Sequence, residues 1–355
     1  MRLHIQHPLV RVLIIAAVTG LGAPIGRSIP VHILDLDKLT RDSDLIVVGE
    51  VAAIQEVGRT SAVIGSQDVP VRVENAQVRI DRVLKATVSI GTPSELIELR
   101  LYVPDKFVGW PSTRLHFYAT YFLKSDASGI IGFTDPAYPF APALPQTHLN
   151  GSTPIDRVVN EIANFLYVPE VALNDRMAAL TYLGHSRSES ATSMLRSALK
   201  SDSQQLRYIS ADKLLERNDI SGLPVAKTAL LRADAGTSDN LVENMSNAIG
   251  IGLKDPNAIE DLTELLRARS TSVRRNAALA LARTQAQRAV TPLLYALNDS
   301  DREVSYYAAI GLAEIAGQLD WRPSMEEFDA DPIKYLKHWS EWQRAGKTQS
   351  QPSPN

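Results

Sequence analysis

VRRNAALALA, residues 273–282, is followed 31 residues further on by VSYYAAIGLA, residues 304–313. Both stretches begin with valine and place apolar residues at helical spacing, so that each has one apolar face. The same step relates residues before them, since Leu262 aligns with Leu293. A repeat that covers two successive helices predicts an array of stacked helix pairs, because one pair cannot bury its own apolar faces.

Further copies of the pattern extend this array toward the N-terminus. LRYISADKLL, residues 206–215, is a third copy, and residues 175–183 and 241–250 are two weaker ones. We therefore expect about five helical pairs between residues 155 and 317.

The stretch LLYALNDSDREVSYYAAIGLAEIAG, residues 293–317, resembles a HEAT repeat of the short, phycobilisome-lyase-like type. Asp299 and Asp301 fall between its two helices, where an acidic side chain caps the helix that follows. The resemblance implies an α-α superhelix and a role in protein interaction, and the family also includes chromophore lyases. Its repeat positions are structural, so it implies no catalytic residue.

The region 31–133 differs from the repeats in having short apolar runs with period-two alternation. Turn residues separate five expected strands. These strands are residues 45–54, 69–84, 96–103, 115–123 and 130–133. The chain is therefore expected to be a multidomain α and β protein, with a small β-barrel or sandwich preceding an all-α, HEAT-like superhelix.

Three segments of this region resemble netrin-like, OB-type barrels: DLIVVGEV (44–51), VRIDRVLKA (78–86) and YATYFLK (118–124). In the inhibitors of metalloproteinases that share this type of barrel, an N-terminal cysteine chelates the protease metal. The chain has no cysteine, so a protease-inhibitor-like β module is kept only as an alternative function.

The flanking segments complete the expected organisation. Residues 1–28 place basic residues before an apolar run and small residues, the pattern of a secretory signal peptide. We therefore expect export to the periplasm or the medium. Residues 134–154 are rich in proline and lack periodicity, which predicts an interdomain linker.

Residues 318–345 are rich in aromatic residues, and Tyr335, Trp339 and Trp342 fall on one face of an expected helix. The segment is expected to cap the exposed end of the solenoid. A ligand cage is the alternative interpretation. The polar residues 346–355 are expected to be a disordered tail.

Composition excludes several classes of function. The formal net charge is −3, from 37 Lys and Arg against 40 Asp and Glu, which argues against nucleic-acid binding. Without cysteine there are no disulfides and no thiolate metal sites. No apolar run after residue 28 is long enough to span a membrane. The sequence lacks a Gly-x-Ser-x-Gly elbow and a phosphate loop, and outside the expected signal peptide it has no histidine pair at metal-ligand spacing. We therefore predict no catalytic residue, no metal and no cofactor.

One candidate binding surface remains, on the second helix of each pair. An arginine or tyrosine recurs there just after the apolar residue that starts the helix. These residues are Arg207, Tyr208, Arg274, Arg275, Tyr306 and Tyr307. Arg and Tyr are favoured as interface anchors, and second helices line the concave face of HEAT-like arrays. We predict a non-enzymatic scaffold of the cell envelope that binds a protein partner on this face. An ordinary solvated helix face is the other interpretation, and a chromophore-lyase-type enzyme is the other function.

Overall fold

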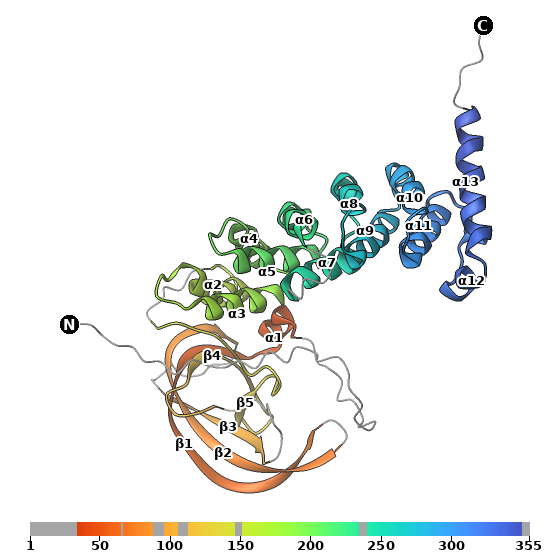
Figure 1. Ribbon diagram of the computed structural model, residues 1–355. Helices are drawn as coiled ribbons and strands as arrows, with labels where there is room; N and C mark the ends of the chain where they lie inside the picture. Colours follow the sequence, from red (N-terminus) through yellow and green to blue (C-terminus); the bar gives the residue numbers. More distant parts are fainter. Residues whose placement is uncertain are drawn as a thin grey trace. The chain divides into compact units, whose positions relative to one another are not determined.

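The computed structural model describes residues 34–64, 67–87, 96–105, 113–145, 151–233 and 240–349 (Figure 1). It divides the chain into two compact units, residues 1–191 and 192–355. The predicted signal peptide, residues 1–28, lies outside the described residues.

The first unit is built on one antiparallel sheet that follows a short helix, α1 (Leu36–Asp42). Its strands are β1 (Leu45–Ile64), β2 (Gln67–Ala86), β3 (Leu96–Pro104), β4 (Tyr118–Ser125), β5 (Ile131–Phe133) and β6 (Phe140–Ala141). The strand order is β3-β2-β1-β4-β5, and β6 pairs with β4. Because β3 and β5 also lie side by side, the sheet curls toward a barrel (Figure 1). The predicted β domain is thus confirmed as a barrel-like sheet.

Alternation along the strands places the core of this sheet on its inner side. Val47, Val78, Leu99 and Tyr121 are fully buried there. Where β1 pairs with β2 at a register shift, a side chain at Gly49 would place its Cβ 2.2 Å from the Arg79 carbonyl oxygen, so only glycine permits the approach.

Strand β1 continues ten residues beyond the predicted end at Ile54. Its distal part lacks apolar alternation, and pairing with β2 holds it in the sheet. Arg59 adds ion pairs to Glu56, at 3.0 Å, and to Asp105, at 3.2 Å. Hydrophobic periodicity could not reveal a strand that is stabilised by its neighbour in this way.

Helices α2 (Pro154–Tyr167) and α3 (Leu173–Gly184) belong to the same compact unit as the sheet, and α4 (Glu189–Ala198) begins there. A buried ion pair between Arg82 on β2 and Glu161 on α2, with N–O 2.6 Å, fastens α2 to the sheet. Strand β6 lies within the segment predicted to be a linker. The division into compact units falls at residue 191, which lies inside the predicted repeat region and not at the predicted linker. The predicted domain boundaries stay a prediction.

The second unit consists of helices in two rows (Figure 1). One row contains α5 (Gln204–Leu215), α7 (Asn240–Gly252), α9 (Thr271–Arg283) and α11 (Arg302–Ile315). The other contains α6 (Leu223–Arg232), α8 (Ile259–Leu265) and α10 (Val290–Ala296). Short 3-10 turns precede α6, α8 and α10, at Ile220–Gly222, Pro256–Ala258 and Gln287–Ala289. In the other row, α5, α7, α9 and α11 each pack on the next helix of the row, which confirms the predicted helical repeat.

The interior between the rows is made by the periodic apolar residues that defined the repeat. Leu262, Leu281, Leu293 and Leu312 are fully buried in one continuous core. At the close approach of α7 to α5, a Cβ on Gly252 would lie 2.3 Å from the Leu215 carbonyl oxygen. The helices can therefore touch there only through glycine.

The aromatic C-terminal segment is built as one more helix pair, α12 (Met325–Ala330) and α13 (Pro332–Gln349), preceded by the turn Leu319–Trp321. The same 31-residue step leads from Val304 to Tyr335 and from Ala308 to Trp339, and all four side chains are buried. Helix α13 continues through residues 346–349, so the prediction of a disordered tail is wrong for these four residues. Residues 350–355 lie outside the described part of the chain.

Candidate partner-binding surface

The six predicted site residues lie in the first two turns of α5, α9 and α11, and each is half-buried. We call these six residues the second-helix surface. The arginines and the tyrosines differ in what they contact. The arginines bind other parts of the array, whereas the rings of the tyrosines pack on the core.

Arg207 and Arg274 each hold the turn that precedes their own helix. Arg207 Nη1 donates to the carbonyl oxygens of Ser201 and Asp202, at 2.7 and 3.0 Å. Arg274 Nη1 donates to those of Ala268 and Arg269, at 3.1 and 3.3 Å. These carbonyls follow the end of the first helix and lack intrahelical partners, so the guanidinium satisfies them. The sequence showed that the arginine recurs, but not that its guanidinium binds the carbonyl oxygens of the preceding turn.

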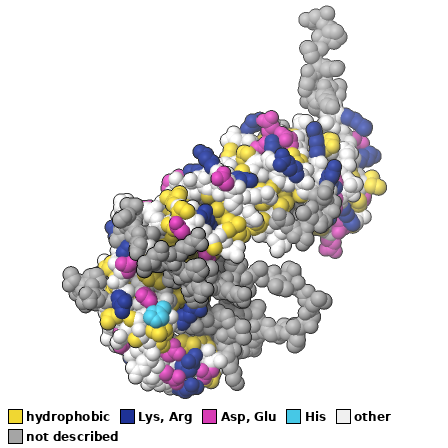
Figure 2. Space-filling view, turned by 60° about the vertical axis from the view of Figure 1, so that its left-hand side comes forward, with side chains coloured by type: hydrophobic (Ala, Val, Ile, Leu, Met, Phe, Trp, Pro, Cys, Tyr) yellow, Lys and Arg dark blue, Asp and Glu magenta, His cyan; other side chains and the backbone are white. Residues whose placement is uncertain are grey.

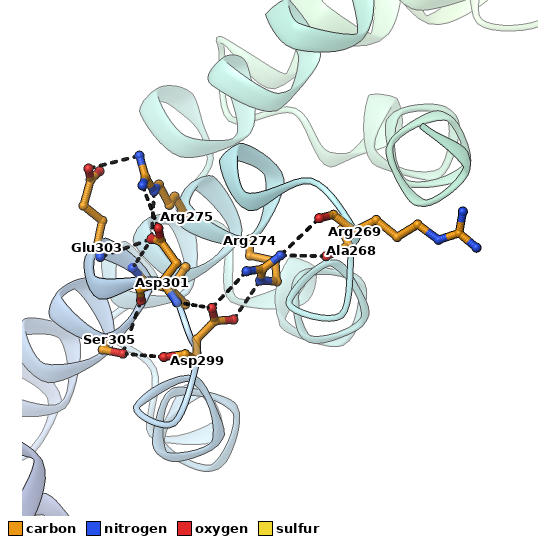
Figure 3. Close-up of polar contacts among 9 residues, drawn as sticks. Ala268, Arg269, Arg274, Arg275, Asp299, Asp301, Glu303 and Ser305 are labelled. Atoms are coloured by element: carbon orange, nitrogen blue, oxygen red, sulfur yellow. Dashed lines mark hydrogen bonds and ion pairs between the residues drawn. The ribbon is translucent and has the colours of Figure 1, made fainter. Parts of the chain in front are cut away.

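Arg274 also joins two successive pairs (Figure 3). Its Nε and Nη2 donate to the two carboxylate oxygens of Asp299, at 2.7 and 3.0 Å. The hydrogen bond to Asp299 is the largest cause that raises the pKa of Arg274. Asp299 in turn accepts from the backbone N–H of Asp301 at 2.8 Å. This bidentate pair fixes the guanidinium plane within the array.

Arg275 makes the neighbouring bridge in the same direction (Figure 3). Its Nε and Nη2 donate to Asp301 at 2.8 and 2.6 Å, and its Nη1 lies 3.0 Å from Glu303. Asp301 also caps α11 by accepting from the N–H groups of Glu303 and Val304, so its predicted capping role is confirmed. The hydrogen bond from Arg275, with those caps, lowers the pKa of Asp301.

Tyr208, Tyr306 and Tyr307 pack their rings against the helical core. The Tyr306 ring lies 5.5 Å from that of Tyr307 and 5.6 Å from that of Phe328 on α12. Burial raises the pKa of Tyr307. Within the described residues, the three hydroxyls make no hydrogen bond. These tyrosines therefore present rigid rings with an available polar group.

A hollow of about 420 Å³ opens beside Arg274, lined by residues that follow α8 and by residues at and after the end of α10. Tyr295, on α10, is 63% exposed at its edge. Tyr295 was not among the predicted site residues. It belongs to a first helix, and an isolated exposed tyrosine gives no sequence signal.

Charge is not concentrated on this unit. On the face shown in Figure 2, basic and acidic side chains are interleaved along the helices, with hydrophobic side chains between them. Among the described residues, no group of three or more His, Asp or Glu side chains could hold a metal ion. Within the same residues, no helix has the length and apolarity needed to cross a membrane.

A family model for HEAT repeats matches residues 236–313 and 259–342. The C-terminal region is therefore a HEAT-repeat array, a fold that generally serves as a protein-interaction scaffold. The second match includes α12 and most of α13, in agreement with the repeat step that leads to Trp339.

Solved structures show only distant likeness. An engineered protein is 18% identical, with a TM-score of 0.33, over 45% of this chain and 79% of its own. The Escherichia coli protein YibA is 19% identical, with a TM-score of 0.31, over 47% and 68%. Human deoxyhypusine hydroxylase, in complex with glycerol, is 16% identical, with a TM-score of 0.24, over 52% and 94%. No curated protein sequence matches the chain.

Proposed function

We propose that the protein is exported and acts in the cell envelope as a non-enzymatic scaffold, which binds a protein partner through the second-helix surface. One observation carries the proposal: Tyr208, Tyr306 and Tyr307 stand on packed helices with their hydroxyls unused. Half-buried tyrosines lose little conformational entropy on binding and combine apolar contact with a hydrogen-bonding group. The leader-like pattern of residues 1–28 supports export.

The two residue types of the second-helix surface have different roles in this proposal. Arg207, Arg274 and Arg275 are engaged with carbonyls or carboxylates of the array, so they set the spacing of the helix pairs. The tyrosines contact the partner. Partner binding should therefore depend on the aromatic rings and little on ionic strength.

We also infer that the first unit is an OB-type barrel, as the resemblance of its strand segments implies. The strand order supports this inference, since β1 pairs with both β2 and β4, and such non-sequential neighbours are typical of Greek-key barrels. We assign no separate ligand to this unit.

Site-specific photo-crosslinking in the native envelope tests the proposal. A photoreactive amino acid at position 208 or 307 should yield one crosslinked species of defined mass. The same residue at position 254, an exposed lysine in the turn after α7, should not. Tyr306→Ala, combined with the photoreactive residue at 307, should abolish that species.

Two results would overturn the proposal. Crosslinking at position 254 as strong as at positions 208 and 307 would refute the assigned surface. N-terminal sequencing that finds Met1 intact on a cytoplasmic protein would refute export.

A further inference from the structure

The hollow beside Arg274 is lined by polar and apolar groups, among them a fixed cationic group. Leu266, Ala268 and Ala296 line it and are almost fully buried, so the accessible lining is mostly polar. Its volume of about 420 Å³ is within the range of small-ligand pockets. Arg274 and Tyr295 are two further lining residues of the hollow.

The in-plane hydrogen-bonding capacity of the Arg274 guanidinium is nearly exhausted. Four of its five N–H donors are used, two by Asp299 and one each by the carbonyls of Ala268 and Arg269 (Figure 3). Its side chain is 15% exposed. What a fixed guanidinium can still offer a ligand is one face of its plane, and aromatic rings stack on such faces.

Asp299 is likewise engaged, since both carboxylate oxygens accept from Arg274 and one also accepts from the Asp301 N–H. The hollow therefore presents no uncompensated charge to an ionic ligand. Tyr295 adds a largely exposed ring, and the exposed Asn298 and Ser300 supply polar groups at the edge. Such edge groups suit the backbone that flanks a bound side chain.

We propose that this hollow is a binding slot for an aromatic side chain of an extended polypeptide, with the ring held between the face of the Arg274 guanidinium and the Tyr295 ring. The inference rests on the proposed scaffold function and names the feature of the partner that this part of the array recognises. It explains how an arginine committed to internal bonds also contributes to binding, because stacking uses the faces of the guanidinium plane and not its in-plane donors.

The full-length protein can be tested with short synthetic probes. The fluorinated probe is N-acetyl-Gly-(4-fluoro-Phe)-Gly-amide, observed through broadening of its fluorine NMR signal. N-acetyl-Gly-Phe-Gly-amide should displace it about ten-fold more strongly than N-acetyl-Gly-Leu-Gly-amide, because only the aromatic ring gains the cation–π contact. Raising the salt concentration should leave the displacement unchanged.

Variants assign the effect to the slot. Tyr295→Ser removes an exposed ring and should abolish the broadening, whereas Ile333→Ser, at a position 73% exposed on α13, should leave it intact. Arg274→Lys keeps the charge but loses the planar face and should weaken the probe about ten-fold. Should Arg274→Lys fail to fold, the Tyr295→Ser result alone decides.

The inference is overturned if the leucine peptide competes equally, if Tyr295→Ser still broadens the probe, or if the wild-type protein gives no broadening. Its failure is distinguishable from that of the scaffold function. Crosslinks from positions 208 and 307 without probe binding would refute only the slot. Probe binding without those crosslinks would refute the second-helix surface.

Discussion

Replacing Glu161 by glutamine is expected to lower the free energy of unfolding of the first unit by about 3 kcal/mol. The Arg82 and Glu161 side chains are 9% and 1% exposed, and their N–O distance is 2.6 Å. Removing one member of such a pair costs roughly 3–5 kcal/mol, because the other is left as an uncompensated buried charge. The lower end applies because Arg82 keeps Asp81, at 2.7 Å, and the Leu144 carbonyl oxygen, at 2.9 Å.

Urea unfolding of the full chain, with amide hydrogen exchange followed over α2, measures this change. A double-mutant cycle with Arg82→Met is the control, since the double variant should be clearly more stable than the sum of the single effects predicts. The state of Arg82 agrees with this reasoning: burial lowers its pKa, but the bond and charge of Glu161, together with the charges of Tyr118 and Asp81, outweigh burial and raise the pKa. A Glu161→Gln change within about 0.5 kcal/mol of wild type, or strict additivity, would refute a tightly coupled buried pair.

Three further expectations concern the helical unit. Gly252→Ala should destabilise it by about 1–3 kcal/mol, because the new Cβ meets backbone at 2.3 Å; Gly58→Ala, in open space, should shift thermal unfolding little. Asp301→Ala should cost about 1–2 kcal/mol in urea unfolding, whereas Asp301→Asn, which retains the cap, should cost clearly less; equal costs would contradict the capping role. Burial lowers the pKa of His338, so its contribution to stability is complete above about pH 6.5 and is lost as the pH falls through the lowered value. The opening equilibrium of α13, measured as exchange relative to the intrinsic amide rate at each pH, should therefore rise from about pH 7 to pH 5, and the same rise in His338→Gln would exclude this residue as its cause.

The helical half of the fold could be predicted from sequence because its stabilising residues recur in register. Val273 and Val304 occupy equivalent buried positions, so the pattern of one helix pair predicts the next pair. The same step also reaches Tyr335 and Trp339, but there the small residues of the earlier pairs become large rings. A repeat search that relies on matching residue types therefore stops one helix pair too early, although the helix-pair arrangement continues through α12 and α13.

The candidate surface was predictable in position but not in role. Arg274 and Arg275 form ion pairs with Asp299 and Asp301 of the next helix pair. The sequence contains these residues, but their pattern does not predict that they are in contact. Side-chain pattern also carries no information about which backbone carbonyls lack partners. The hydrogen bond from Arg207 to the preceding turn therefore could not be predicted without the three-dimensional structure of that turn.

The last helix pair constrains how such an array can change in evolution. Helix α13 packs Tyr335 and Trp339 inward and leaves Lys337, Glu341 and Arg344 exposed. A duplicated pair added after α13 would have to desolvate these charges before it could pack. A pair inserted between α9 and α10, by contrast, would meet the alanine-lined faces that already fit one another. Growth of the array by duplication should therefore proceed from its interior, with the aromatic pair carried along unchanged as its permanent end.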